Sequence, residues 1–227
     1  MEQKKRVYTF GNGKAEGNAS MREQLGGKGA NCAEMNLVGV PVPPGFTITT
    51  DVCNEYYQVG QEKIVALLND EVMAAVKHIE TLMNCKFGDP KNPLLVSVRS
   101  GARASMPGMM DTILNLGLND EVAEGMCVKT QNPHFVYDSY RRFVQMYGDV
   151  VLGMKPVNKT DIDPFEKIID EVKEIRHIKL DKDLNVDELK LLVARFKAAI
   201  KEQTGSDFPT NPIEQLWGAI SLYSAVG

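Results

Sequence analysis

Short apolar runs alternate with longer amphipathic stretches over the first 118 residues of the chain. In one stretch, Val72, Val76 and Ile79 recur at three- and four-residue steps, which predicts a helix over 70–84 with Met83 on the same stripe. The runs 7–10, 46–50 and 94–98 are rich in β-branched, aromatic or leucine side chains, as is typical of strands. Because 94–98 is apolar at nearly every position, we expect this strand to be covered on both faces.

Glycine and proline mark the ends of these elements. A helix is predicted over 25–38, because Gly39 follows it and the prolines of 41–44 cannot continue it. Asp51, directly after the second strand, is expected to cap a further helix. Strands and helices therefore alternate in this half, which predicts an α/β or α+β lobe.

From residue 119 the pattern is helical throughout. Apolar residues recur at three- and four-residue steps in three successive segments, which predicts a helical subdomain over 119–204, followed by a C-terminal segment over 205–227. The stripes are Tyr137, Tyr140, Val144, Tyr147 and Val151; Phe165, Ile168, Ile169, Val172 and Ile175; and Leu189, Leu192, Phe196 and Ile200.

Composition and charge exclude several classes of protein. The 227 residues include 26 Lys and Arg against 30 Asp and Glu, a formal charge of -4 that argues against a general nucleic-acid binder. No apolar stretch is long enough for a signal peptide or a membrane span, so we expect a cytoplasmic protein with no membrane partner. The four cysteines at 32, 53, 85 and 127 are too widely spaced for a zinc or redox motif, and we expect them to be reduced and buried.

The first candidate site is the run Gly26, Gly27, Lys28 and Gly29 at the predicted start of a helix. Glycines there let backbone N–H groups approach an anion, the helix start adds partial positive charge, and a lysine adds a full charge. The run differs from the phosphate-binding Walker motif, because Lys28 is followed by Gly29 rather than by Ser or Thr. Taken alone, three glycines around a lysine more often form a tight turn with a solvated side chain than a ligand site.

The second candidate site begins at Arg99, at the end of the predicted strand 94–98. A long run of small residues, glycine and proline follows it, which is typical of a mobile loop that folds over a substrate. Arg99 is the candidate anion partner, although a strand-end ion pair would explain it as well. Two cationic positions at strand-to-helix junctions of one lobe favour the anion site.

Other reactive side chains are isolated along the chain. His78, His134 and His177 have no partners at catalytic or metal-binding spacing, so we expect non-catalytic roles for them. The acidic residues are spread over helix faces that we expect to be solvated, which gives no metal site in this chain.

Several segments together resemble the N-terminal nucleotide-binding region of the pyruvate, phosphate dikinase family, from about residue 7 to about residue 218. The most specific is VRSGARASMPGMMDT, residues 98–112, because the related phosphoenolpyruvate synthases carry a different loop after the arginine. The others are EGNASM (16–21), LGGKGANCAEM (25–35), VPPGFT (42–47) and YDSYRRF (137–143).

The resemblance implies an α+β fold: an ATP-grasp-type first lobe over 1–118 with a helical subdomain inserted, and with the second grasp lobe absent. It also implies that ATP is bound and that ATP, phosphate and pyruvate are converted into AMP, pyrophosphate and phosphoenolpyruvate. Lys28 and Arg99 would be the catalytic cations that neutralise phosphate oxygens. The nucleotide-binding residues implied are Gly26, Gly27, Lys28, Gly29, Arg99, Gly101, Ala102, Ser105, Met109 and Asp111.

Family members extend several hundred residues beyond Gly227, so the resemblance places other parts of the reaction outside this chain. These parts are the Mg²⁺ ligands of the second lobe, a swivelling phosphohistidine domain and a pyruvate-binding barrel; a homodimer of the full-length enzyme is also compatible with it. We therefore expect the chain alone to be inactive. Two alternatives are a non-catalytic module that binds a nucleotide or a protein, and a dikinase acting on a glucan, whose arginine loop is less similar.

Overall fold

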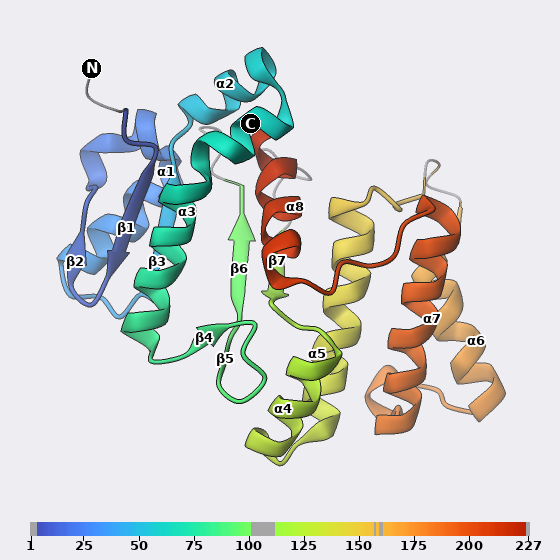
Figure 1. Ribbon diagram of the computed structural model, residues 1–227. Helices are drawn as coiled ribbons and strands as arrows, with labels where there is room; N and C mark the ends of the chain where they lie inside the picture. Colours follow the sequence, from blue (N-terminus) through green and yellow to red (C-terminus); the bar gives the residue numbers. More distant parts are fainter. Residues whose placement is uncertain (1–3, 101–111, 157, 159–160, 226–227) are drawn as a thin grey trace. The chain divides into compact units, whose positions relative to one another are not determined.

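The structure is a computed structural model that describes residues 4–100, 112–156, 158 and 161–225. The chain divides into two compact units. Unit 1 comprises the described residues within Met1–Phe87, Arg99–Thr112 and Ile220–Gly227, and unit 2 those within Gly88–Val98 and Ile113–Ala219. Each unit mixes helices with short strands, which confirms the mixed α and β class (Figure 1).

Unit 1 is built on a small antiparallel sheet with strand order β2-β1-β3, in which Val7 lies opposite Ile48. Helices α1 and α3 both pack against β1 and β3 (Figure 1). The buried core includes Val7, Leu25, Leu68 and Val72. The elements are β1 (Val7–Gly11), β2 (Lys14–Ala15), η1 (Ala19–Met21), α1 (Arg22–Leu37), β3 (Gly45–Ile48), α2 (Asp51–Val59), α3 (Gln61–Met83) and β4 (Lys86–Phe87).

Unit 2 is mainly helical, with α5 packed against α4 and α7, and α7 against α6. The rings of Phe165 and Phe196 meet edge to face with centroids 4.9 Å apart between α6 and α7. The elements are β5 (Pro93–Leu94), β6 (Val96–Arg99), β7 (Thr112–Leu116), α4 (Asp120–Thr130), α5 (Pro133–Met146), a π-helical turn (Tyr147–Val151), α6 (Pro164–Arg176), η3 (Asp181–Asp183), α7 (Val186–Thr204) and α8 (Pro212–Ala225). Arg99, Thr112 and the last residues of α8 count with unit 1.

Side chains fix the starts of several of these helices. The Asn119 side chain accepts a hydrogen bond from Val122 N at 2.8 Å before α4, which satisfies an N–H group that the helix itself cannot. At α7, Asn185 and Glu188 form a reciprocal capping box. A capping side chain therefore fixes the first turn of these two helices, whereas α1, α2 and α3 begin without one.

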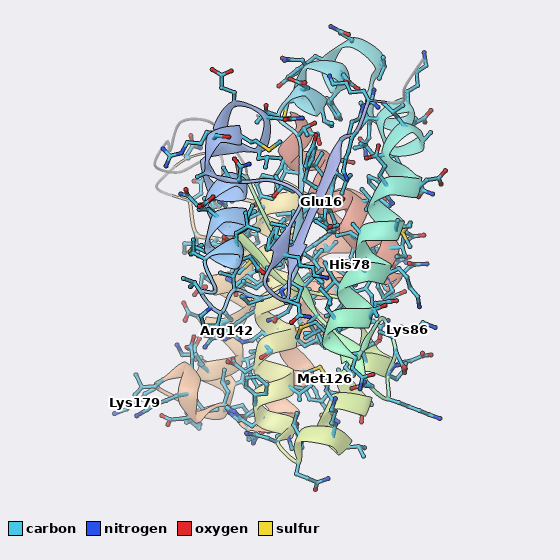
Figure 2. The ribbon with its side chains drawn as sticks, turned by 90° about the vertical axis from the view of Figure 1, so that its left-hand side faces the viewer. Glu16, His78, Lys86, Met126, Arg142 and Lys179 are labelled. Carbon is cyan, nitrogen blue, oxygen red and sulfur yellow. The ribbon has the colours of Figure 1, made fainter. Side chains whose placement is uncertain are left out.

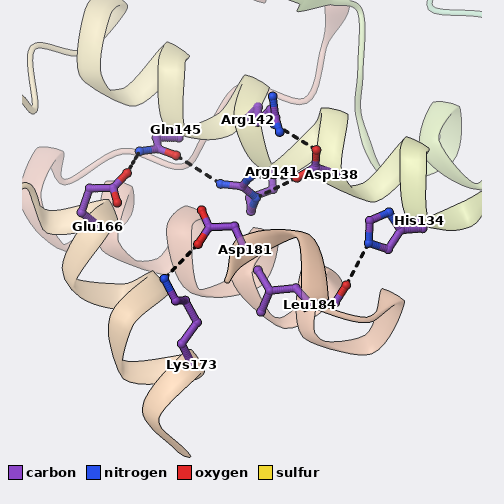
Figure 3. Close-up of polar contacts among 9 residues, drawn as sticks. All are labelled: His134, Asp138, Arg141, Arg142, Gln145, Glu166, Lys173, Asp181 and Leu184. Carbon is purple, nitrogen blue, oxygen red and sulfur yellow. Dashed lines mark hydrogen bonds and ion pairs between the residues drawn. The ribbon is translucent and has the colours of Figure 1, made fainter. Parts of the chain in front are cut away.

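A chain of polar contacts runs along α5 and joins it to α6 (Figure 3). The buried Arg141 donates to Asp138 at 2.8 Å and to Gln145 at 3.5 Å, and Gln145 donates to Glu166 at 2.9 Å. Arg142 binds the second oxygen of Asp138 at 2.9 Å. Because the carboxylate of Asp138 compensates the buried guanidinium, the charge on Arg141 is explained by structure alone.

Most of the predicted helices are present, with corrections at their edges. The stripes of α5, α6 and α7 are largely buried, but Ile175 and Met83, which we placed on buried stripes, are 72% and 48% exposed because each lies at a helix end. Asp51 is the first residue of α2 rather than its cap, since Thr50 occupies that position. Among the described residues, every strand ends before residue 119.

The predicted strand 94–98 is wrong in two respects. It is split into β5 and β6 at Leu95, and β6 is alternately half-buried and exposed rather than covered on both faces. The four cysteines are free, as expected, but half-buried rather than buried.

Candidate functional site

The start of α1 is interrupted at Gly26, whose φ of 68° and ψ of 169° are not helical. Glycine is the residue that adopts this left-handed φ at no steric cost. The regular helix therefore begins at Gly27, and the N–H groups of Gly27, Lys28 and Gly29 fall in its first turn. N–H groups in the first turn of a helix, together with the helix dipole, favour a nearby anion.

Gly27 and Gly29 face different surroundings in this first turn. A Cβ atom on Gly29 would lie 2.5 Å from Thr47 Cγ2 of β3, whereas one on Gly27 would meet no described atom within 4 Å apart from its chain neighbours and its own helix backbone. The glycine at position 29 thus lets α1 approach the sheet, while the space beside Gly27 is open.

This contrast gives a stability prediction for a matched pair of variants. Gly29→Ala is expected to destabilise the chain by about 1–3 kcal/mol, because the new methyl group overlaps the stiff Thr47 side chain. Gly27→Ala is expected to be neutral or slightly stabilising, since the site is open and alanine favours helix. Urea denaturation of both variants measures the difference, and equal midpoints would contradict the packing argument.

Lys28 is half-buried in the first turn, and Arg99 is exposed as the last residue of β6. Within the described ranges no carboxylate forms an ion pair with either side chain. Both residues belong to unit 1.

The structure brings Gly26, Gly27, Lys28 and Gly29 together at one helix start. The predicted loop residues Gly101, Ala102, Ser105, Met109 and Asp111 lie outside the described residues.

A hollow of about 440 Å³ in unit 1 lies apart from these residues and is lined by Lys5, Thr9, Glu16, Glu71 and His78, among others. Glu16 and His78 are labelled in Figure 2. The charges in the hollow are already compensated. Lys5 is paired with Glu16, and Glu71 accepts hydrogen bonds from the backbone N–H groups of Arg6 and Val7 at 2.9 and 3.0 Å. No unpaired charge in it points to a ligand.

The other histidines have structural contacts. His134 Nε2 lies 2.8 Å from the carbonyl oxygen of Leu184 (Figure 3), and His177 caps α6 in the left-handed conformation. Among the described residues no group of three or more His, Cys, Asp or Glu side chains is placed to hold a metal ion. The described residues therefore do not fit a Mg²⁺ site.

Asp149, in the π-helical turn, is an ionisable residue whose environment the sequence did not reveal. Burial, and then the nearby charge of Asp163, raise its pKa to about 7, while Lys155 acts in the opposite direction and Glu166 adds a smaller increase. Its Oδ1 atom is shielded and has no hydrogen-bond partner among the described residues. The folded state therefore disfavours the charged form of this carboxyl group.

A pH dependence of stability follows. In the unfolded chain the pKa of Asp149 is about 3.9. Between about pH 4 and 7 the folded chain therefore binds more protons than the unfolded chain, and the contribution of Asp149 to the free energy of unfolding falls as the pH rises. Asp149→Asn should remove that fall, and should raise the melting temperature relative to the unaltered chain at pH 8 but not at pH 4. Asp170→Asn is the control, since that side chain is 73% exposed. An equal effect of Asp149→Asn at both pH values would contradict the prediction.

Comparison with known proteins agrees with the sequence motifs. The family model described as "Pyruvate phosphate dikinase, AMP/ATP-binding domain" matches residues 22–71 and 65–202. The chain therefore belongs to this family of nucleotide-binding domains. Among its relatives, pyruvate, phosphate dikinase from Clostridium symbiosum is 54% identical over 215 residues, which are 94% of this chain and 23% of that protein.

Two further relatives are similar over nearly the same region. The chloroplastic enzyme of Flaveria pringlei is 48% identical over 96% of this chain and 22% of its own length, and the Rhizobium meliloti enzyme is 48% identical over 94% of this chain and 23% of its own length. The chain thus spans less than a quarter of the length of these relatives. In the part of the chain that the structure describes, no helix is both long and apolar enough to cross a membrane.

Proposed function

We propose that this chain is the nucleotide-binding part of a pyruvate, phosphate dikinase and that the start of α1 binds phosphate groups of ATP. The observation that carries the proposal is the turn at Gly26, which starts a regular helix at Gly27 and puts Lys28 in its first turn. One helix turn then supplies backbone N–H groups, a helix dipole and an ammonium group, which are the groups that phosphate binding uses.

Arg99 supplies the second cation of this proposed site. Together with Lys28 it would neutralise oxygens of the transferred phosphoryl group, while Gly101, Ala102, Ser105, Met109 and Asp111 would cover the phosphates. In-line phosphoryl transfer needs positioning and charge neutralisation more than covalent assistance. Lys28 and Arg99 therefore have the chemistry that the step needs.

The wider assignment follows the family. The reaction would convert ATP, phosphate and pyruvate into AMP, pyrophosphate and phosphoenolpyruvate through a phosphohistidine on a separate swivelling domain, with pyruvate bound in a barrel. In this proposal residues 1–118 form the first ATP-grasp lobe and residues 119–204 the helical subdomain, and Mg²⁺ is bound by carboxylates outside the described residues. A homodimer and a cytoplasmic location remain predictions; the relatives include both bacterial and chloroplastic enzymes.

An NMR titration tests the phosphate site directly. Pyrophosphate and ATP should shift the amide signals of Gly27, Lys28 and Gly29 in this chain, and adenosine, which has no phosphate, should not. Lys28→Met should weaken the pyrophosphate response at the same signals. Shifts confined to other parts of the chain would refute the proposed site.

The alternative, a non-catalytic binding module, is distinguished by a chimera. In this chimera the chain replaces the matching 215 residues of the Clostridium symbiosum enzyme, to which it is 54% identical. Formation of AMP and phosphoenolpyruvate in proportion favours the dikinase. A folded chimera that binds ATP but forms neither product favours the binding module.

A further inference from the structure

The two peptide carbonyls before the Gly26 turn are bound by a single residue from elsewhere in the sequence. Thr50 N donates to the carbonyl oxygen of Gln24 at 2.8 Å, and Thr50 Oγ1 donates to that of Glu23 at 2.6 Å. In an uninterrupted helix these carbonyls would accept hydrogen bonds from the N–H groups of Gly27 and Lys28, four residues later. Thr50 therefore binds the acceptors that would otherwise continue the helix through the turn.

The Thr50 hydroxyl makes this contact in place of its ordinary one. Thr50 is the N-cap residue of α2, where a threonine side chain normally accepts a hydrogen bond from the first turn of its own helix. Here it makes no such capping bond and donates to Glu23 instead. The hydroxyl thus binds Glu23, in the part of α1 before the Gly26 turn, and α2 is left without a side-chain cap.

A second contact holds the same short segment from the sheet. Gln24 Nε2 donates to the hydroxyl oxygen of Tyr8, on β1, at 2.8 Å. Residues 23 and 24 are therefore held both by β1 and by the residue that links β3 to α2. Because α1 also packs on β1 and β3, these bonds fix the direction in which the first-turn N–H groups point.

We propose that Thr50 is a positioning residue for the phosphate-binding start of α1 and acts through the carbonyl groups of Glu23 and Gln24. The inference rests on the proposed phosphate site and adds a residue to it. Thr50 does not touch the nucleotide. It holds the turn in the shape that presents the N–H groups of Gly27, Lys28 and Gly29 to a phosphate group before the ligand arrives, which lowers the ordering cost of binding.

The test compares three variants of this chain by NMR titration with inorganic pyrophosphate. Thr50→Val removes the donor at nearly constant volume, and Thr50→Ser keeps it. Thr81→Val is the matched control, because the Thr81 hydroxyl donates to the carbonyl oxygen of Lys77 at 2.9 Å within α3. Thr50→Val should raise the Kd about three- to tenfold, which is what one net hydrogen bond is worth. Thr50→Ser should restore the affinity, and Thr81→Val should leave it unchanged.

The outcomes separate this inference from the proposed function. Absent shifts at Gly27, Lys28 and Gly29 in the unaltered chain would refute the phosphate site, and the inference with it. Shifts present there but with the same Kd in Thr50→Val, or a Thr50→Ser variant as weak as Thr50→Val, would overturn the inference alone. An equal loss in Thr81→Val would overturn it as well, since the effect would then be one of general stability.

A Thr50→Val chain that does not fold leaves a second variant to decide. Tyr8→Phe removes the oxygen that accepts from Gln24 and keeps the ring. Weaker pyrophosphate binding by Tyr8→Phe supports the positioning of this segment, and unchanged binding overturns it. A melting curve of each variant shows whether it is folded, and the conclusion is drawn from a folded variant.

Discussion

Replacing Lys28 or Arg99 in the Clostridium symbiosum chimera is expected to slow transfer of phosphate from ATP to the carrier histidine by roughly 30- to 1000-fold. Each replacement removes a charged contact to the transferring phosphoryl group, a loss of about 2–4 kcal/mol of transition-state stabilisation, as for removal of an oxyanion donor. Lys28→Met and Arg99→Ala should fold normally, because neither side chain forms an ion pair with the described residues. Rapid-quench measurement of the phosphohistidine gives the rate.

Exposed cations elsewhere serve as controls for this prediction. Lys77 and Arg142 are 76% and 66% exposed and pair with carboxylates on their own helices, so Lys77→Met and Arg142→Met should leave the rate unchanged. The double variant of Lys28 and Arg99 should be less impaired than the product of the single effects if both cations act on one phosphate site. An Arg99→Ala chimera that forms phosphohistidine at a near-normal rate would remove Arg99 from the site.

The sequence predicts the glycine turn but not what holds it. The glycines and Lys28 are adjacent, so their helix start can be inferred from a local pattern. The contact from Thr50 joins residues 27 positions apart, and Thr50 was noted only as the end of a β-branched run. Such a contact depends on how β3 and α1 pack, which no local pattern encodes.

The full length of α3 can be predicted from the spacing of its apolar residues. The prediction began the helix at residue 70, whereas α3 begins at Gln61. Ile64 and Leu68 are buried and continue the stripe of Val72 and Val76 at four-residue steps, so the helical period extends back to the true start. The charged residues at 62 and 63 lie on the solvated side and do not break it.

In the strand 94–98 the opposite holds: the sequence pattern predicts the strand correctly but not the burial of its two faces. Its leucines and valines favour a strand, and β5 and β6 are strands. Coverage of both faces requires neighbouring elements, and β6 pairs in a sheet of only two strands with β7. A run of apolar residues indicates that a segment can be buried, and the surrounding fold decides whether it is.

The chain of residues 1–227 on its own is expected to bind ATP only in the millimolar range and to form no AMP above background. Arg99 is exposed and Lys28 half-buried, and charge contacts at such positions contribute about 0–1 kcal/mol each and are screened by salt. Micromolar binding requires about 8 kcal/mol, whereas millimolar binding requires about 4 kcal/mol. Among the described residues no group of three or more His, Cys, Asp or Glu side chains could hold Mg²⁺, so this part gives the ion no ligand set. Calorimetric titration of ATP with and without Mg²⁺, beside an assay of AMP formation with phosphate and pyruvate, measures both quantities, and the chimera provides the positive control. Magnesium-dependent micromolar binding by the chain alone, or AMP formation at a rate near that of the chimera, would show that residues 1–227 already contain a complete nucleotide site.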